Sequence, residues 1–155
     1  MNEQWFLLGD IHGSAQPVHY FYQKNKERLS LDSSENYMIL LGDVGANFAL
    51  TGQRDHKFKS ELPFTFICLR GNHEARVKTV IDKNPDSWET ISKYDGSIFV
   101  EKEFPHIEYL ADGPAVYNFK SYKTLSLPGA YSVDKYYRQA RHLTWYKDEQ
   151  LNEKE

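Results

Sequence analysis

The stretch Trp5-Phe6-Leu7-Leu8-Gly9-Asp10-Ile11-His12-Gly13 is an apolar run that ends in two polar side chains set between glycines. Residues 4–9 are too short and too continuously apolar for a surface helix, so they predict a buried strand. Asp10 and His12 are two positions apart, and an extended backbone would place both side chains on the same side. A carboxylate beside an imidazole suits Mn²⁺, Fe²⁺ or Zn²⁺. The alternative is an Asp cap followed by a solvated histidine.

Two further strings follow apolar runs in the same way. Residues 37–41 lead into Gly42-Asp43-Val44-Gly45, and residues 64–69 lead into Arg70-Gly71-Asn72-His73-Glu74. The two oxygens of Asp43 can serve one metal ion each, and a shared anion lowers the repulsion between two cations. Asn72 offers a neutral carbonyl oxygen, and His73 beside it is placed to act as a general acid, with Glu74 orienting its ring. Alternatively, Asp43 is only a turn residue and Asn72 a helix cap.

The connections between these runs predict an α/β fold. Ser14 and Pro17 signal the start of a helix over residues 18–29, and a short helix around residues 56–61 is the expectation for the second connection. Strand, helix, strand, helix and strand build a parallel sheet with right-handed crossovers. Ligands of such sheets bind at the carboxyl ends of the strands, where all three strings fall.

The later half predicts a meander or a second sheet. Its β-prone segments are short and separated by Gly or Pro, with a tight turn expected at Asp112-Gly113. They are residues 97–100, 107–110, 115–119 and 124–127. Helices are expected over residues 135–141 and 147–154.

Composition restricts the class of protein. The 155 residues are 40% apolar and 26% charged, with a net charge of −3, which predicts one globular domain over residues 1–155. No apolar run approaches the roughly 18–20 residues of a membrane span, and the apolar stretch over residues 5–8 is too short for a signal peptide, so the expected address is cytoplasmic without membrane contact. No basic block indicates a nucleic-acid surface. Cys68, the single cysteine, is expected to be buried and inert.

The three strings together resemble the calcineurin-like metallophosphoesterase family, and Gly129-Ala130-Tyr131-Ser132 resembles a later segment of bacterial and phage members. The resemblance implies an αββα sandwich and a hydrolase of phosphate mono- or diesters that uses two divalent metal ions, Mn, Fe or Zn. By the resemblance, Asp10 and His12 bind the first ion, Asp43 bridges, Asn72 binds the second, and His73 protonates the leaving group. Hydroxide generated between the two ions would attack phosphorus.

The sequence departs from the family pattern at its last histidines. The family carries a Gly-His-x-His string near the C-terminus, and this chain has no Gly-His pair. Its other histidines, His19, His56, His106 and His142, are not expected to replace those ligands. The chain therefore resembles the N-terminal portion of a member, with a weak second metal site and an incomplete second sheet. Open strand edges then predict a homodimer or an aggregation-prone monomer.

Two alternatives to an active enzyme stay open. One is a catalytically weak or inactive member that binds a metal ion, a nucleotide or a protein partner. The other is a plain α/β domain in which the strings are only turns and caps. The substrate class of the phosphorylated compound is not readable: Arg70–Glu74 resembles the protein-phosphatase and dinucleoside-tetraphosphatase branch, whereas the Asp43 string lacks that branch's Asp-Arg-Gly. Arg70 is expected to form a structural ion pair.

Overall fold

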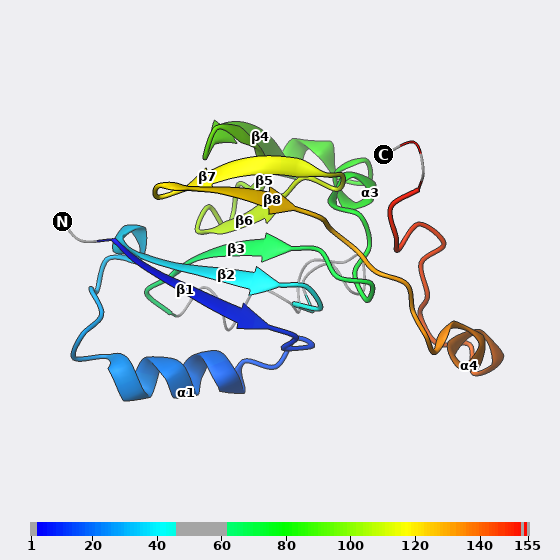
Figure 1. The fold of residues 1–155 in the computed structure, drawn as a ribbon, viewed down its shortest axis with the longest axis horizontal. Coiled ribbons are helices and arrows are strands. Elements are labelled where there is room, and N and C mark those ends of the chain that lie inside the picture. Colours follow the sequence, from blue (N-terminus) through cyan, green and yellow to red (C-terminus); the bar gives the residue numbers. More distant parts are fainter. Residues whose placement is uncertain (1–2, 46–61, 153, 155) are drawn as a thin grey trace.

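The computed structural model describes residues 3–45, 62–152 and 154 (Figure 1). The strands are β1 (Gln4–Gly9), β2 (Asn36–Leu41), β3 (Thr65–Leu69), β4 (Trp88–Lys93), β5 (Gly96–Glu101), β6 (Ile107–Leu110), β7 (Ala115–Phe119) and β8 (Tyr122–Ser126). The helices are α1 (Gln16–Asn25), α3 (Val77–Ile81) and α4 (Lys135–Ala140), with short 3-10 turns η1 (Ser33–Glu35) and η2 (Pro85–Ser87).

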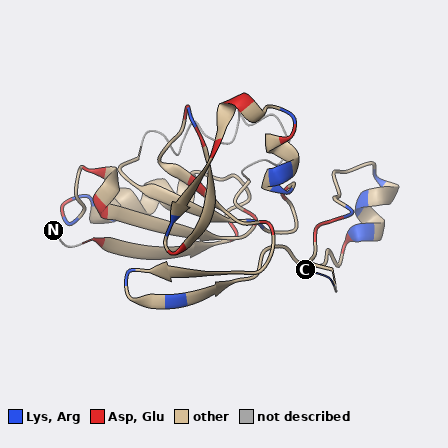
Figure 2. Ribbon diagram, turned by 90° about the horizontal axis from the view of Figure 1, so that it is seen from above, with Lys and Arg blue, Asp and Glu red and all other residues tan. Residues whose placement is uncertain are grey.

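Within the described residues, eight strands form two sheets. The larger sheet has the order β1-β2-β3-β6-β5-β4, and β7 pairs with β8 in a separate two-stranded sheet. Strands β1, β2, β3 and β6 run parallel, whereas β5 and β4 are antiparallel additions. Helix α1 and the β7–β8 hairpin lie on opposite faces of the larger sheet (Figures 1 and 2). The mixed α/β fold with a small second sheet agrees with the predicted fold class.

Strand β2 shows why the layers form. It is apolar at successive positions, so both of its faces can be buried. Met38 and Leu40 belong to the core cluster that packs against α1, while Tyr37 and Ile39 belong to the cluster shared with β7. The period of two along a strand distributes these side chains to the two layers.

The prediction of a buried first strand is correct in its bounds and wrong in its burial. Strand β1 is the edge of the larger sheet, and Leu7 is 69% exposed. Within the described residues β1 pairs only with β2, and none of its positions is fully buried: residues 4–6 and 8 are half-buried, and residues 7 and 9 are exposed.

The first helix is shorter than predicted. It runs from Gln16 to Asn25 rather than over residues 18–29, and Ala15 rather than Ser14 occupies the N-cap position. Residues 26–28, predicted as part of the helix, form a non-helical turn instead. Polar Lys and Arg side chains at residues 24–28 bury nothing that would extend the helix.

The later strands are arranged differently from a simple meander. Strands β5 and β6 join the larger sheet together with β4, a polar strand that the sequence did not predict. Asp112-Gly113 forms a bend between the two sheets and no hairpin. The Asp112 carboxylate instead accepts hydrogen bonds from the amides of Val77 and Lys78, 2.9 and 2.8 Å away, at the start of α3, also unpredicted. The tight hairpin turns fall at residues 94–95 and 120–121.

The predicted C-terminal helix over residues 147–154 is absent from the described residues of that segment, which form turns. Tertiary contacts override the local pattern there, since the Glu149 side chain is buried. Helix α4 forms as predicted and lies beside the sheets rather than over β7 and β8, with Lys and Arg residues along it (Figure 2). The short helix expected around residues 56–61 lies outside the described residues. None of the helices in the described segments is long and apolar enough to pass through a bilayer.

Candidate metal centre

The three polar strings meet at one edge of the larger sheet. Each directly follows one of the parallel strands β1, β2 and β3, whose carboxyl ends share that edge. Backbone hydrogen bonds connect the loops: the His12 amide donates to the Asp43 carbonyl at 2.7 Å, and the Gly42 amide donates to the Leu69 carbonyl at 3.1 Å. The predicted convergence of the three loops is therefore present in the fold.

The backbone at these loops is strained. Asp10, His12 and Asp43 adopt φ angles of 53°, 44° and 40°, in the left-handed region that residues other than glycine rarely occupy. The sequence expectation of an extended backbone through Asp10 and His12 is thus wrong. Strain of this kind persists only where the surrounding structure enforces it, and it is concentrated at functional sites.

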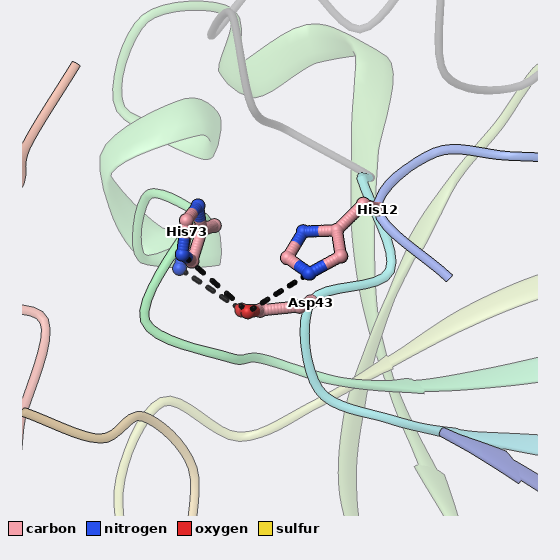
Figure 3. A group of neighbouring side chains, drawn as sticks. All are labelled: His12, Asp43 and His73. Atoms are coloured by element: carbon pink, nitrogen blue, oxygen red, sulfur yellow. Dashed lines mark hydrogen bonds and ion pairs between the residues drawn. The ribbon is translucent and has the colours of Figure 1, made fainter. Parts of the chain in front are cut away.

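The Asp43 carboxylate lies between two imidazoles (Figure 3). Its Oδ2 atom is 3.9 Å from Nε2 of His12 and 3.6 Å from Nε2 of His73. One potential ligand atom from each of these three residues lies within 4.8 Å of the other two. The Asp43 side chain is only 14% exposed and His73 25%, so a bound cation would be partly shielded from water. Two imidazoles and a carboxylate suit a Mn²⁺, Fe²⁺ or Zn²⁺ ion.

Asp10 and Asn72 border this group. The Asp10 Oδ1 atom is 2.6 Å from Nε2 of His12, so their side chains meet even though the backbone is not extended. Asn72 donates its Nδ2 hydrogen to the Ser132 hydroxyl at 2.9 Å. Asp10, Asp43 and Asn72 all line a pocket of about 300 Å³ that opens at this sheet edge. The donor set and the adjoining space fit a metal centre that accepts a further ligand.

Glu74 connects the loops. Its carboxylate accepts hydrogen bonds from the Gly45 and Gly71 amides, each at 2.7 Å, and the side chain is buried. The sequence interpretation assigned Glu74 to the His73 ring, whereas these contacts cross-link the loops after β2 and β3. The Gly45 backbone lies so close to Gly13 that a Cβ atom on Gly45 would be 2.3 Å from the Gly13 Cα. Close backbone packing therefore holds the loops in register.

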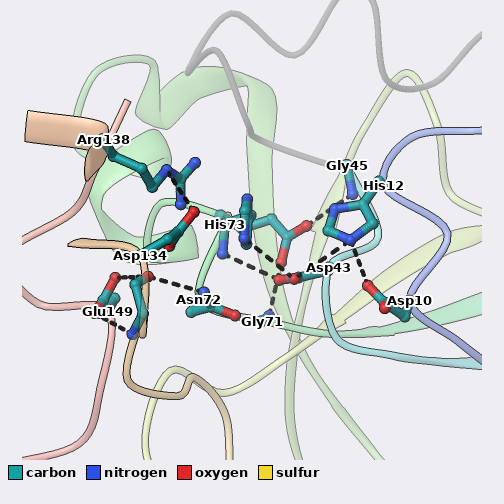
Figure 4. Close-up of polar contacts among 12 residues, drawn as sticks. Asp10, His12, Asp43, Gly45, Gly71, Asn72, His73, Asp134, Arg138 and Glu149 are labelled. Carbon is teal, nitrogen blue, oxygen red and sulfur yellow. Dashed lines mark hydrogen bonds and ion pairs between the residues drawn. The ribbon is translucent and has the colours of Figure 1, made fainter. Parts of the chain in front are cut away.

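Ser132 and Glu149 were not predicted as site residues. Ser132 contacts Asn72, and the Glu149 carboxylate accepts hydrogen bonds from the Ser132 amide at 2.8 Å and from its hydroxyl at 2.5 Å (Figure 4). The Gly-Ala-Tyr-Ser segment was the signal for Ser132. Nothing local in the polar sequence around Glu149 indicates that this carboxylate is buried.

Arg70 is structural, as predicted. Its side chain is buried, Nε lies 3.6 Å from Asp112 Oδ1, and Nη1 donates to the Glu149 carbonyl at 2.9 Å. Burial lowers the pKa of the Arg70 guanidinium and raises the pKa of the Asp112 carboxyl, while their mutual attraction opposes both shifts. The pair joins β3 to the loop after β6.

The remaining described histidines lie away from the cluster, as expected. His106 precedes β6, which runs parallel to β3, and therefore sits at the opposite edge of the sheet. His19 is half-buried on α1, and His142 is exposed after α4. His56 lies outside the described residues. Cys68 is buried in β3, in agreement with the prediction.

A mixed sheet with an Asp and His cluster at the carboxyl ends of its parallel strands places candidate metal ligands where such sheets bind their ligands. The chain belongs to the calcineurin-like phosphoesterase family, whose family model matches residues 6–155. Members of this family are phosphoesterases that generally bind divalent metal ions. Comparisons with curated proteins and with solved structures gave no significant match.

Proposed function

We propose that the chain, acting as one domain over residues 1–155, hydrolyses phosphate mono- or diesters with the help of two divalent metal ions. The observation that carries the proposal is the position of the Asp43 carboxylate between His12 and His73. Membership of a phosphoesterase family supplies the reaction type. The substrate class and the metal, with Mn the first choice for assay, stay open within the proposal.

The proposal gives each residue a role. Asp10, His12 and Asp43 would hold one ion, and Asp43 with Asn72 would hold a second, weaker one. When bound, such ions lower the pKa of water and neutralise the charge that develops on the phosphoryl group. His73 would carry a proton on Nε2 and donate it to the leaving oxygen. Its position supports this role, because the His73 amide donates to Asp43 Oδ1 at 3.1 Å and so holds the residue beside the cluster.

The pocket next to the cluster supports a substrate with a compact phosphate group. It has a volume of about 300 Å³, and its lining includes Gly71, Gly129 and Ala130 beside three of the proposed ligands, Asp10, Asp43 and Asn72. Small residues leave the backbone accessible and allow close approach of a ligand. The alternative function, binding of a metal ion or nucleotide without turnover, uses the same pocket.

The test compares Asp43→Asn with Asp86→Asn, a control at an exposed position on η2. We expect Mn²⁺-dependent cleavage of an aryl phosphate ester by the unaltered chain and by the control. Asp43→Asn should lose activity at least about 100-fold, since it removes the shared anionic ligand. Isothermal titration with Mn²⁺ alone separates the alternative, which predicts ion binding without turnover. If the unaltered chain shows no turnover and binds no divalent ion, the proposed function is wrong.

A further inference from the structure

A buried hydrogen-bond chain leads from the C-terminal segment to Asn72. The Asn72 Nδ2 atom is 2.9 Å from Ser132 Oγ, and Ser132 Oγ is 2.5 Å from Glu149 Oε2. Ser132 is 1% exposed and Glu149 2% exposed, so water competes little for these bonds. The second Glu149 oxygen accepts from the Ser132 amide at 2.8 Å. Both carboxylate oxygens are thereby directed at one residue.

The Glu149 carboxylate fixes the direction of each hydrogen bond in this series. A carboxylate can only accept hydrogen bonds, and a serine hydroxyl has one proton to donate. The Ser132 hydroxyl proton must therefore point to Glu149, which leaves a lone pair on Ser132 Oγ toward Asn72. Only the NH₂ end of the Asn72 carboxamide can donate to that lone pair. The carbonyl end must then point the other way.

That other direction is the metal centre. Asn72 Nδ2 is the atom that contacts Ser132, and Figure 4 shows the Asn72 carboxamide with its nitrogen on the side of Glu149 and its oxygen on the side of Gly71. Asn72 lines the same pocket as Asp10 and Asp43. We propose that Glu149 is a positioning residue that acts through Ser132 to keep the Asn72 carbonyl oxygen, rather than its NH₂ group, toward the metal pocket. The inference rests on the proposed function for the identity of the group that Asn72 meets.

The segment that carries Glu149 is anchored independently. The Glu149 carbonyl accepts from Arg70 Nη1 at 2.9 Å, and the Gly129 amide donates to the Arg70 carbonyl at 2.8 Å. A Cβ atom on Gly129 would lie 2.0 Å from the Glu149 carbonyl oxygen, so the backbone segments around Gly129 and Glu149 are in direct contact. Arg70 lies two residues before Asn72. The anchoring therefore sets Glu149 at a fixed distance from the residue that it orients.

Replacement of the Glu149 carboxylate by an amide should reverse the direction of these hydrogen bonds. In Glu149→Gln, the carbonyl oxygen still accepts from the Ser132 amide, so the NH₂ group faces the Ser132 hydroxyl. The Ser132 hydroxyl then accepts a hydrogen bond from the glutamine NH₂ group and donates its own hydrogen toward Asn72. This favours a flipped Asn72 carboxamide, with its NH₂ group toward the pocket. An NH₂ group repels a cation. The side-chain volume is unchanged, so the fold is expected to be retained.

The experiment measures the carboxamide and the metal separately. The Asn72 side-chain amide signals in a ¹H–¹⁵N spectrum, assigned by their loss in Asn72→Asp, should shift in Glu149→Gln. In Mn²⁺ titration, the second ion should bind about 10- to 100-fold more weakly while the first is unchanged, as for other residues that orient a metal ligand. Ser132→Ala should have the same effect, Ser132→Thr should retain binding, and Ser126→Ala is the control at another buried serine.

A double variant gives the sharpest arm. A carboxylate at position 72 has two equivalent oxygens, so Glu149→Gln should not alter metal affinity in an Asn72→Asp background. If the unaltered chain binds two ions and Glu149→Gln binds both equally well, the inference is wrong and the proposed function stands. If the unaltered chain binds no ion, the proposed function is wrong. In that case the Asn72 amide signals decide the inference, and unchanged signals overturn it.

Discussion

Gly71 lies directly against the Asp43 carboxylate. A Cβ atom placed on Gly71 would be 2.1 Å from Asp43 Oδ1 and 2.2 Å from the Asp43 amide nitrogen. No side chain fits at this distance, so the loop after β3 must carry glycine for the loop after β2 to present its carboxylate. The glycine is part of the candidate metal centre even though it offers no ligand.

Gly71→Ala should therefore displace Asp43. We expect the free energy of unfolding to fall by about 1–3 kcal/mol, the usual cost of overpacking, and Mn²⁺ affinity to fall with it. Gly113→Ala is the matched control, because a Cβ there meets nothing within 4 Å. Urea denaturation and Mn²⁺ titration of both variants measure the effect. Equal metal affinity in the two variants would contradict the role assigned to Gly71.

The proposed role of His73 as general acid predicts that activity depends on the leaving group. A general acid matters most when the leaving oxygen is strongly basic, so His73→Asn should lower kcat for an alkyl phosphate by about 10²–10⁴-fold. For a nitrophenyl phosphate, whose leaving group needs no proton, the loss should be much smaller. If His73 were instead an essential ligand, both substrates would suffer equally and Mn²⁺ affinity would fall.

Tyr94 predicts loss of stability at alkaline pH. Burial raises the pKa of Tyr94 above its ordinary 10.0, and the Glu108 carboxylate, which accepts from its hydroxyl at 2.7 Å, raises it further. The unfolded chain releases this proton near pH 10 and the folded chain keeps it, so the stabilisation is present below that pH and is lost above it. The free energy of unfolding should fall by at most about 1.4 kcal/mol per pH unit from this residue.

Tyr94→Phe isolates that contribution. At pH 8 it should lower the free energy of unfolding by about 1–3 kcal/mol, since Glu108 loses a buried donor. From about pH 9 to about pH 11 its decline should be shallower than in the unaltered chain. Tyr37 and Tyr117 also have raised pKa values, so some decline should persist. Parallel curves for the two proteins would show that Tyr94 does not titrate as argued.

Open strand edges support self-association, which we keep as a proposal. The hairpin β7–β8 exposes Val116, Tyr122 and Leu125, and within the described residues its two strands pair only with each other. Light scattering should show a dimer that forms as concentration rises. Leu125→Lys should weaken the dimer without lowering the melting temperature, whereas Leu31→Lys, at an 86% exposed position outside the helices and strands, should leave the dimer unchanged. A constant monomer mass over a wide concentration range would refute it.

The parts of the fold that could be read from sequence are those set by local pattern. The apolar runs ending at Gly9, Leu41 and Leu69 predicted three parallel strands and one shared edge, because strand burial and crossover rules act over short stretches. Strand β4 was missed because its Trp-Glu-Thr-Ile-Ser-Lys pattern is polar and half exposed. Strand β4 forms because it pairs with β5, and a pairing between segments cannot be recognised from the local sequence pattern.

The candidate site divides in the same way. Asp10, His12, Asp43, Asn72 and His73 each follow a strand end, which sequence alone reveals. Glu149 does not, since its surroundings are polar and predicted a surface helix. Its burial comes from Arg70 and Ser132, which are distant in sequence. The residue proposed to orient a ligand is therefore found by structure, whereas the candidate ligands are found by pattern.

The proposed dependence of Asn72 on Glu149 has a consequence for biosynthesis. The ribosome delivers Asn72 long before Glu149, so the sheet and its three loops can assemble while the carboxamide is still able to rotate. On this proposal, the pocket for a second ion would mature only after the segment around Glu149 docks against Arg70. A nascent chain would then gain its first proposed ion site before its second, in the direction of translation.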